Sequence, residues 1–351
     1  MQSYHTIGLM SGTSLDGLDM VLCKFTFNQN WHFNIIKGQT VEYPKEWNAK
    51  LVSAPTLSGF ELSLLHKEYG SYIGNCVNEF LNDITIDIDL IASHGHTVFH
   101  QPDKKLTVQI GDGQEIAVKT GIKTICDFRS FDVALGGQGA PLVPVGDKLL
   151  FSDYDYCLNL GGFANISFDE TYIRFAYDIC PANIILNYLA NKLGHRYDKN
   201  GALGLLGKIN YDLLENLKSL NYYSQNHPKS LGKEWLDNIF LPVIEGFKIS
   251  LHDQLRTVYE HIAHQISNAL NPNKNSKILV TGGGVHNKFL INLIKHNTLS
   301  EIIIPDKKII DYKEALIFAL LGVLRLENQV NCLASVTGAT KDSSTGIIYN
   351  P

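Results

Sequence analysis

The chain lacks an excess of positive charge and any long apolar run. Its 351 residues include 30 lysines and arginines against 35 aspartates and glutamates, a formal net charge of −5. Without a global positive field, we expect neither nucleic acid nor an anionic membrane as a partner. No apolar run reaches the length of a membrane-spanning helix. Residues 1–5 lack the basic and apolar regions of a signal peptide, so we expect none.

Cysteine is sparse as well. The six cysteines are scattered along the chain and form no Cys-x-x-Cys pair. Dispersed cysteines in a long chain are typical of reduced thiols, so we predict a cytoplasmic protein.

Three common nucleotide-binding motifs are also missing. The chain has no Gly-x-x-x-x-Gly-Lys-Ser/Thr, which argues against a P-loop protein. It has neither the Val-Ala-Ile-Lys strand nor the His-Arg-Asp loop of a protein kinase. No Gly-x-Gly-x-x-Gly follows the first predicted strand, which argues against a Rossmann dinucleotide site.

What the chain does contain is a glycine-rich polar turn near its N-terminus. Apolar runs at 6–10 and 20–25 flank residues 11–19, which predicts two strands joined by a turn. Gly12 and Gly17 allow backbone N–H groups to approach an anion closely. The turn is therefore a candidate phosphate-binding loop.

The polar residues of this turn suit the same ligand. The hydroxyls of Ser11, Thr13 and Ser14 can donate to phosphate oxygens. Asp16 and Asp19 carry oxygen ligands of the kind that Mg²⁺ prefers. The alternative is a hairpin turn whose serine, aspartate and glycine residues satisfy their own backbone.

The strand–turn–strand pattern returns about one domain length later. Residues 156–160 and 163–168 predict two strands around a Gly-Gly turn, and 173–177 predicts a third strand that ends at Asp178. We interpret this as a weak internal repeat of residues 6–25. The chain is also long for a single core, so we predict two domains.

The remaining elements follow from hydrophobic spacing and predict an α/β protein. We expect further strands at 31–41, 90–92, 106–110, 123–127, 277–281 and 302–304. We expect helices at 61–82, 114–120, from 181 onward, and at 255–270, 287–293 and 313–326. Residues 93–97 are expected to end the strand at 90–92, and residues 127–144 to form a loop.

Two carboxylates and one arginine are candidates for chemistry. Asp178 could act as a base in phosphoryl transfer, or as the N-cap of the helix that follows it. Glu314 opens an apolar helix, where a carboxylate also suits the helix dipole. Arg129 could clamp a carboxylate or phosphate through two hydrogen bonds, or form a salt bridge with Asp127 or Asp132.

Histidines and a third glycine turn complete the candidates. His94, His96 and His100 could hold a metal, but their spacing matches no common zinc site, and hydrogen bonding to a ligand is the favoured interpretation. The glycine run 282–284 follows a strand and precedes a helix. That place suits a phosphate or the close packing of a nucleotide.

Several blocks of sequence are recognisable when they are taken together. The longest and most specific runs from Asp132 to Pro144. The other blocks are residues 8–19, 93–97, 109–112, 127–129, 159–166, 282–287, 314–315 and 336–339. In this order, and over nearly the whole chain, they resemble the anhydro-N-acetylmuramic acid kinase family.

This resemblance implies the fold shared by acetate and sugar kinases, Hsp70 and actin. That fold has two RNase H-like α/β domains, with ATP in the cleft between them. The first domain would comprise residues 1–130 plus 330–351 and carry the first phosphate loop. The second would comprise residues 131–329 and carry the catalytic aspartate and the adenosine loop.

The resemblance also implies a reaction. The γ-phosphoryl group of ATP would pass to O6 of 1,6-anhydro-N-acetylmuramic acid while water opens the anhydro bridge at C1. The product would be N-acetylmuramic acid 6-phosphate, made during peptidoglycan recycling. ATP and Mg²⁺ would be the cofactors, the partner a small amino sugar, and a homodimer is common in the family.

Roles for individual residues follow from the same resemblance. The catalytic residues would be Asp178, as the base that activates water, with Glu314 and Arg129. The ATP and phosphate contacts would be Gly12, Thr13, Ser14, Leu15, Asp16, Gly17, Leu18, Asp19, Gly161, Gly162, Gly282, Gly283 and Gly284. The substrate contacts would be His94, Gln138, Pro141, Asn165 and Asn183. Mg²⁺ would be held through the phosphates, with Asp16 as a candidate ligand.

The chain departs from the family pattern next to the catalytic aspartate. Cys180 and Ala182 stand where the family has glycines. The other departures are His96, Asp147, Asn187 and Asn200. We expect phosphoryl transfer to be retained. The alternatives are a kinase for a related amino sugar and a non-catalytic ATP-binding regulatory module of the Hsp70-like fold.

Overall fold

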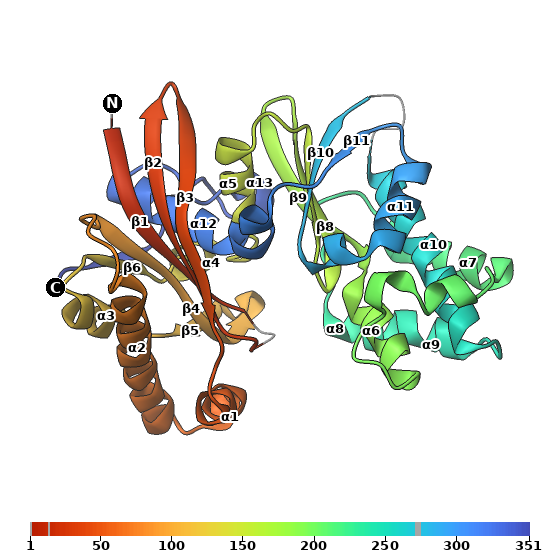
Figure 1. Cartoon of the computed structure of the whole chain (residues 1–351), viewed down its shortest axis with the longest axis horizontal. Helices are drawn as coiled ribbons and strands as arrows, with labels where there is room; N and C mark the ends of the chain where they lie inside the picture. Colours follow the sequence, from red (N-terminus) through yellow and green to blue (C-terminus); the bar gives the residue numbers. More distant parts are fainter. Residues whose placement is uncertain (1, 13–14, 271–274) are drawn as a thin grey trace. The chain divides into compact units, whose positions relative to one another are not determined.

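The computed structural model describes residues 2–12, 15–270 and 275–351. The chain forms two compact units, Met1–Leu150 with Tyr312–Pro351, and Phe151–Asp311. The colours of Figure 1 show that the first unit takes in segments from both ends of the chain. The structure thus groups residues 131–150 and 312–329 with the first unit, whereas they were expected in the second domain.

The first unit is built on one mixed sheet. Its strands are β1 (Gln2–Ser11), β2 (Leu18–Asn28), β3 (Asn30–Val41), β4 (Leu90–Gln101), β5 (Leu106–Ile110), β6 (Thr124–Cys126) and β12 (Ile347–Tyr349). Their order is β12-β6-β4-β1-β2-β3, and β5 pairs with β4. β2 runs antiparallel to both β1 and β3, whereas β1, β4 and β6 are parallel.

The central strand β1 is buried on both faces. On one face its Ile7 and Leu9 share a core with Tyr69 and Ile73 of α2, where apolar residues recur at helical spacing. On the other face α12 approaches the backbone of Gly8 so closely that an added Cβ would lie 1.9 Å from the Ala315 carbonyl oxygen. This contact explains why the helix groups with the first unit.

Among the described residues, seven helices belong wholly or mainly to the first unit. They are α1 (Lys45–Ser53), α2 (Gly59–Leu81), α3 (Gly113–Thr120), α4 (Ser130–Ala134), α5 (Val143–Leu150), α12 (Lys307–Leu326) and α13 (Ala334–Thr337). In the described part of the chain, none of the helices is long and apolar enough to cross a bilayer.

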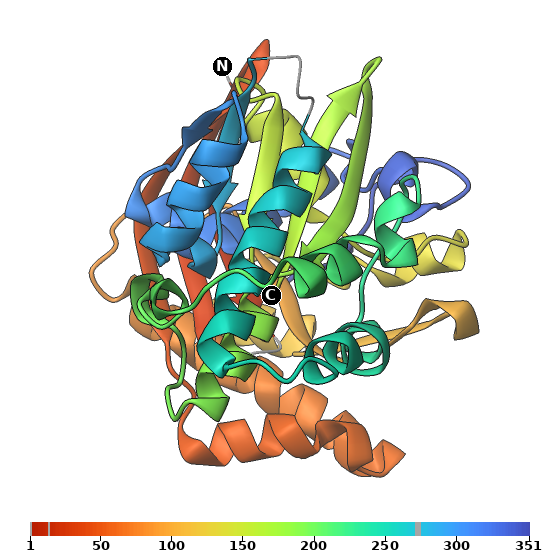
Figure 2. The ribbon, with the colours of Figure 1, turned by 90° about the vertical axis from the view of Figure 1, so that its right-hand side faces the viewer.

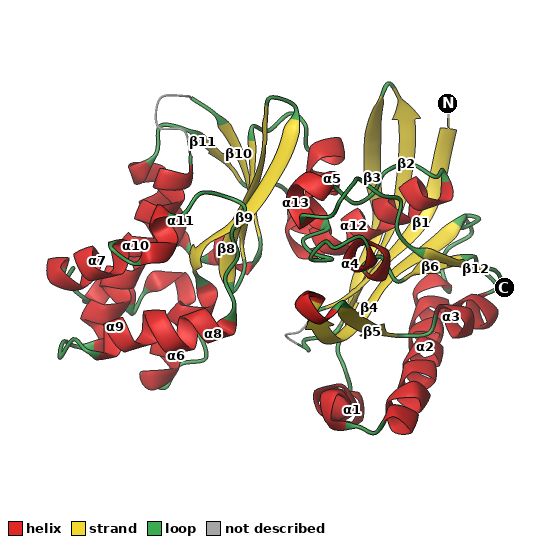
Figure 3. Cartoon of the chain, turned by 180° about the vertical axis from the view of Figure 1, so that it is seen from behind, coloured by secondary structure: helices red, strands yellow, loops and turns green. Residues whose placement is uncertain are grey.

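The second unit repeats the same sheet. Its strands are β7 (Tyr156–Leu160), β8 (Phe163–Glu170), β9 (Ile173–Pro181), β10 (Lys277–Thr281) and β11 (Glu301–Ile303). Their order, β11-β10-β7-β8-β9, matches β6-β4-β1-β2-β3 in chain connectivity and in strand direction. Figure 3 shows the strands of each unit in yellow and the helices in red. The internal repeat and the RNase H-like α/β fold class are therefore confirmed.

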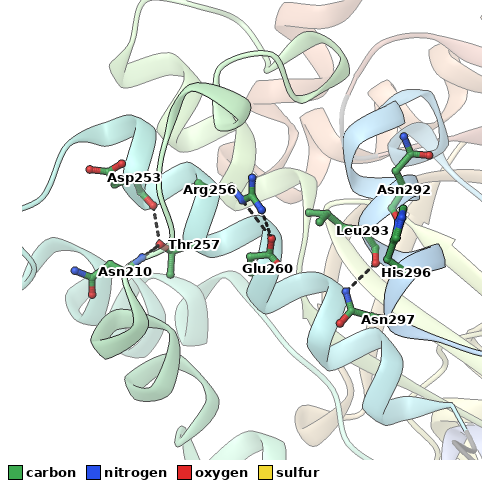
Figure 4. A network of polar contacts seen from close by, with 9 residues as sticks. All are labelled: Asn210, Asp253, Arg256, Thr257, Glu260, Asn292, Leu293, His296 and Asn297. Carbon is green, nitrogen blue, oxygen red and sulfur yellow. Dashed lines mark hydrogen bonds and ion pairs between the residues drawn. The ribbon is translucent and has the colours of Figure 1, made fainter.

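Helices and an insertion complete the second unit. The helices are α6 (Asn183–Lys192), α7 (Tyr211–Lys218), α8 (Lys233–Trp235), α9 (Leu241–Glu245), α10 (Leu251–Ala269) and α11 (Lys288–Asn297). The long helix α10 lies across the sheet in Figure 2, and its Val258, Ile262 and Ile266 enter the core. At the start of α7, the Asn210 N–H donates to Thr257 Oγ1 of α10 at 2.9 Å, which ties the insertion to this helix (Figure 4).

Several predicted boundaries were wrong. β4 continues through residues 93–97 because this stretch pairs with β1 and β5. Residues 127–144, predicted as a loop, contain α4 and the start of α5. The helix predicted at 313–326 is α12, which begins at Lys307, so Glu314 lies about two turns inside it rather than at its start.

Candidate active site

The candidate phosphate loop, residues 12–19, forms hydrogen bonds through its described residues. The Leu15 N–H donates to the Gly12 carbonyl at 3.3 Å. Asp19 Oδ1 accepts a hydrogen bond from Thr40 Oγ1 at 2.6 Å, which fixes the end of the loop. The predicted contacts Thr13 and Ser14 lie outside the described residues.

A buried chain of hydrogen bonds supports the start of this loop. The hydroxyls of Tyr69 and Tyr43 lie 2.5 Å apart, and Tyr43 donates to Ser11 Oγ at 2.7 Å. Ser11 Oγ lies 3.1 Å from His96 Nδ1. Burial lowers the pKa of His96, and the tautomer of its neutral ring sets which of Ser11 Oγ and His96 Nδ1 donates. The Ser11 hydroxyl, a candidate phosphate donor, therefore has two partners inside the protein.

His94 and Arg129 form one hydrogen-bonded unit. Arg129 donates to His94 Nε2 from Nε at 3.1 Å and from Nη2 at 2.9 Å, and to the Gly139 carbonyl at 2.6 Å. His94 Nδ1 must then carry the proton, and it lies 2.9 Å from the Gly95 carbonyl oxygen. The alternative interpretation was a salt bridge from Arg129 to Asp127 or Asp132. In the described part of the chain, the Arg129 guanidinium forms no such salt bridge.

The electrostatics of this pair follow from its burial. Burial, and then the positive charge of Arg129, hold the pKa of His94 well below its usual range. Burial also lowers the pKa of Arg129 to about 10, while Glu314 opposes that fall. A neutral histidine beside a guanidinium that is still charged at pH 7 leaves a net positive charge, which suits an anion. His94 also lines a cavity of about 250 Å³ in the first unit, beside Asp127 and Ser130.

The loop that carries Gln138 and Pro141 is organised by Asp132. Its fully buried carboxylate accepts hydrogen bonds from the Gly139 N–H and the Thr337 hydroxyl, both at 2.8 Å. Cys332 Sγ donates to the same group at 3.1 Å. The Gln138 and Pro141 side chains remain exposed, so they are free to meet a ligand.

Glu314 lies on α12 next to a buried ion pair. Its side chain is exposed, yet partial burial of the carboxyl raises its pKa, and the negative charge of Asp19 adds to the rise. Lys313 and Arg129 oppose the rise, in that order. Lys313 Nζ contacts Asp147 Oδ1 at 2.7 Å, and both side chains are at most 7% exposed. Solvent access to Glu314 makes the effect of burial on its carboxyl smaller than for an enclosed group.

In the second unit, Asp178 sits beside a β-bulge. Asn165 of β8 pairs with Asp178, but the preceding Ala164 pairs with Cys180, so Ile179 is an extra residue on β9. Bulges re-aim side chains and are frequent next to active sites. The prediction that β9 ends at Asp178 was wrong, because the strand continues to Pro181. The alternative of an N-cap is excluded, since the cap of α6 is Ala182.

The half-buried carboxylate of Asp178 has one protein donor in the described residues. The Leu231 N–H donates to Oδ2 at 2.9 Å. Burial raises the pKa of this carboxyl, and the Leu231 N–H opposes the rise. A carboxylate that keeps one oxygen without a protein donor can accept a proton from a bound water.

The two other glycine turns lie together in the second unit. Gly282 has a φ of +84°, and an added Cβ would lie 2.4 Å from Asn159 Oδ1, so only glycine fits. Asn183 Nδ2 donates to the Leu160 carbonyl at 2.9 Å, just before the 161–162 turn. The carbonyls of Gly161 and Gly162 accept N–H groups at the start of α6.

The departures from the family pattern at 180 and 182 are absorbed by the core. Cys180 and Ala182 are both fully buried in the apolar cluster of the second unit. Cys180 lies on β9 and Ala182 is the N-cap of α6, so both side chains pack into the interior of the second unit.

The candidate residues therefore fall into two groups. The first unit carries the phosphate loop, His94, Arg129, Gln138, Pro141 and Glu314. The second carries Gly161, Gly162, Asn165, Asp178, Asn183 and the run 282–284. Sequence reasoning missed Leu231, because a backbone donor leaves no signal in residue type. It also missed the Lys313–Asp147 pair, although Asp147 had been noted as a departure.

Comparison with known proteins gives a consistent result over the whole chain. The family model described as anhydro-N-acetylmuramic acid kinase matches residues 4–351. A protein of that name from Pseudoalteromonas translucida is 36% identical, covering 94% of this chain and 93% of its own length. Those from Vibrio parahaemolyticus (35%, 98% of each chain) and Clostridioides difficile (36%, 95% of each chain) agree. The chain belongs to the anhydro-N-acetylmuramic acid kinase family.

Proposed function

We propose that this chain is an ATP-dependent kinase that converts 1,6-anhydro-N-acetylmuramic acid into N-acetylmuramic acid 6-phosphate in peptidoglycan recycling. The observation that carries the proposal is the family match across residues 4–351, with relatives of that name at 35–36% identity. The candidate polar groups of both units would supply the chemistry that such a reaction needs.

In the proposed reaction, Asp178 acts as the general base. A water oxygen bonds to C1 of the sugar and gives a proton to Asp178 as the C1–O6 bond breaks. O6 then bonds to the γ-phosphorus, and the bond from that phosphorus to the β,γ-bridging oxygen breaks to release ADP. Asp178 later returns its proton to solvent. The half-buried carboxylate with one N–H donor suits this part.

The first unit would bind and stabilise negative charge. The Arg129 guanidinium, oriented by His94 and the Gly139 carbonyl, is placed to hold an anionic substrate group or the transferring phosphoryl group. Exposed Glu314, Gln138 and Pro141 would contact the sugar. In the second unit, Asn165 and Asn183 would do the same.

ATP would lie on the three glycine turns, at 12–19, 161–162 and 282–284. Mg²⁺, which screens phosphate charge in such reactions, would be held through the phosphates, with the exposed Asp16 carboxylate as its candidate ligand. The free and buried cysteines fit the predicted cytoplasmic location. That location and a homodimer stay predictions.

The test is an incubation of the purified chain with ATP, Mg²⁺ and the anhydro sugar, followed by mass spectrometry. The proposal expects a product heavier than the substrate by phosphate plus water. A product heavier by phosphate alone would show phosphorylation without opening of the anhydro bridge. If such a product formed from another amino sugar instead, the chain would have a different substrate. No product with the anhydro sugar would overturn the proposal.

A further inference from the structure

Asp178 is hydrogen-bonded by a segment that lies outside the family motifs. We name residues 222–231 the edge segment. It belongs to the insertion between α6 and α10 and passes alongside β9, the edge strand of its sheet. An edge strand leaves backbone N–H and C=O groups unpaired on its outer side, so a covering segment can bind them.

The edge segment contacts Asp178 at three points. The Leu231 N–H donates to the carboxylate at 2.9 Å. The Asp178 N–H donates to the Lys229 carbonyl at 3.4 Å. The Tyr222 hydroxyl donates to the Asp178 carbonyl at 2.5 Å. The side chain and both backbone polar groups of one residue are thus held by ten residues of another part of the chain.

The edge segment is itself closed and anchored. Lys229 Nζ donates to the carbonyls of Tyr222 at 3.1 Å and Gln225 at 2.9 Å, which closes the segment into a loop. The same ammonium lies over the rings of Tyr222 and Tyr177. The His227 ring stacks on Tyr177 with 5.6 Å between centroids and 5° between planes. The loop therefore has a fixed place on the strand.

We infer that the edge segment is a positioning element for the catalytic base, and that Tyr222 and Lys229 are its positioning residues. They touch neither the carboxylate nor any reacting atom, but they hold the strand backbone at the bulge and bring the Leu231 N–H to the carboxylate. This inference rests on the proposed role of Asp178.

The physical argument concerns both orientation and proton affinity. A base must point at its water to within a fraction of an ångström, and a bulge by itself leaves the strand free to shift. The Leu231 N–H favours the ionised carboxylate against the effect of burial. Loosening the segment would misdirect the carboxylate and raise its pKa further.

The chain offers a matched pair of variants for the test. Tyr222→Phe removes the bond to the Asp178 carbonyl. Tyr223→Phe is the control, because the neighbouring Tyr223 is also in the segment but bonds to His261 Nε2 at 2.9 Å, away from Asp178. Lys229→Met opens the loop, and Lys229→Arg keeps the charge that closes it.

We expect Tyr222→Phe and Lys229→Met to lower kcat about tenfold and to leave KM for ATP within about twofold. The acidic arm of their pH–kcat profile should move to higher pH, and Lys229→Arg should recover part of the loss. Tyr223→Phe should keep wild-type kcat and pH profile.

Equal losses in the two tyrosine variants, or losses without a pH shift, would overturn the inference and reduce the segment to a structural role. Failure of the proposed function looks different, because the wild-type chain itself would then form no phosphorylated product. Melting temperatures of all four variants separate these outcomes from simple unfolding.

Discussion

The two units share one strand order but treat their third strands differently. In each unit the pairing of the second and third strands slips by one residue, with Ile36 extra on β3 and Ile179 extra on β9. Only the bulge on β9 adjoins a carboxylate, Asp178. The two bulges lie at different places along their strand pairs, near the start of β8 but in the middle of β2.

Two of the candidate residues in the first unit also differ from Asp178 in how completely their polar groups, or those of a neighbour, are satisfied. In the first unit, Arg129 bonds to His94 and to Gly139, and Asp132 accepts three hydrogen bonds. In the second, the Asp178 carboxylate has a single N–H donor among the described residues. Groups that recognise charge gain from being locked, whereas a base needs a free oxygen.

The largest expected effect among the tests of this contrast is that of Asp178→Asn. Without a base, kcat should fall about 10²- to 10⁴-fold, because general-base catalysis contributes that much. ATP affinity, measured by calorimetry, should change less than about twofold, since the proposed phosphate contacts do not include Asp178. Glu170→Gln, an exposed carboxylate change on the neighbouring strand, is the control. Wild-type turnover by Asp178→Asn would contradict the assigned role.

Next is the buried ion pair of the first unit. Lys313→Met removes the ammonium from a buried carboxylate, so the free energy of unfolding should fall by about 3–5 kcal/mol. Urea unfolding measures this. Lys307→Met, on the same helix but 82% exposed in its pair with Asp311, should cost less than about 1 kcal/mol. Similar losses in both would mean that burial does not distinguish the pairs.

A smaller effect is expected for Arg129→Lys. The charge stays, but the fork that reaches His94 and Gly139 is lost. One charge-assisted hydrogen bond is worth about 1.5–3 kcal/mol, so kcat/KM should fall roughly 10- to 100-fold. Arg256→Lys, which alters an ion pair with Glu260 in the second unit, should leave kcat/KM unchanged. Should the lysine variant match wild type, the locked geometry of Arg129 would be irrelevant to turnover.

The smallest effect concerns pH. Asp178 must be ionised to accept a proton, and burial raises its pKa above the usual range of an aspartate. The rate should therefore decline as pH falls through this raised value, before an exposed aspartate would titrate. A pH–kcat profile of wild type measures it. A profile that stays flat down to the usual aspartate range would remove burial as the dominant effect on this carboxyl.

Much of the architecture was predictable from local pattern. The first three strands, the helix at 61–82 and the strands around the 161–162 turn lie where apolar spacing placed them. Boundaries failed where tertiary pairing extended an element, as in β4, whose residues 93–97 pair with β1 and β5. The polar composition of residues 93–97 suggested that the strand ends before them. The hydrogen bonds that continue the strand join it to neighbouring strands, and the sequence does not show such pairing.

For the site, residue types indicated the candidates but not their partners. Asp178 and Arg129 could each be singled out as reactive groups, yet the sequence equally allowed an N-cap and a salt bridge. Only the folded chain excluded these two alternatives. Arg129 donates to His94, and β9 continues beyond Asp178.

The sequence alone thus determined the repeated strand order, the family and the types of the polar groups, because these depend on hydrophobic periodicity and on residue identity along the chain. The tertiary structure alone decided which polar groups are satisfied. Such pairing joins residues far apart in sequence, as Leu231 and Asp178 are, through a backbone N–H that every residue except proline carries.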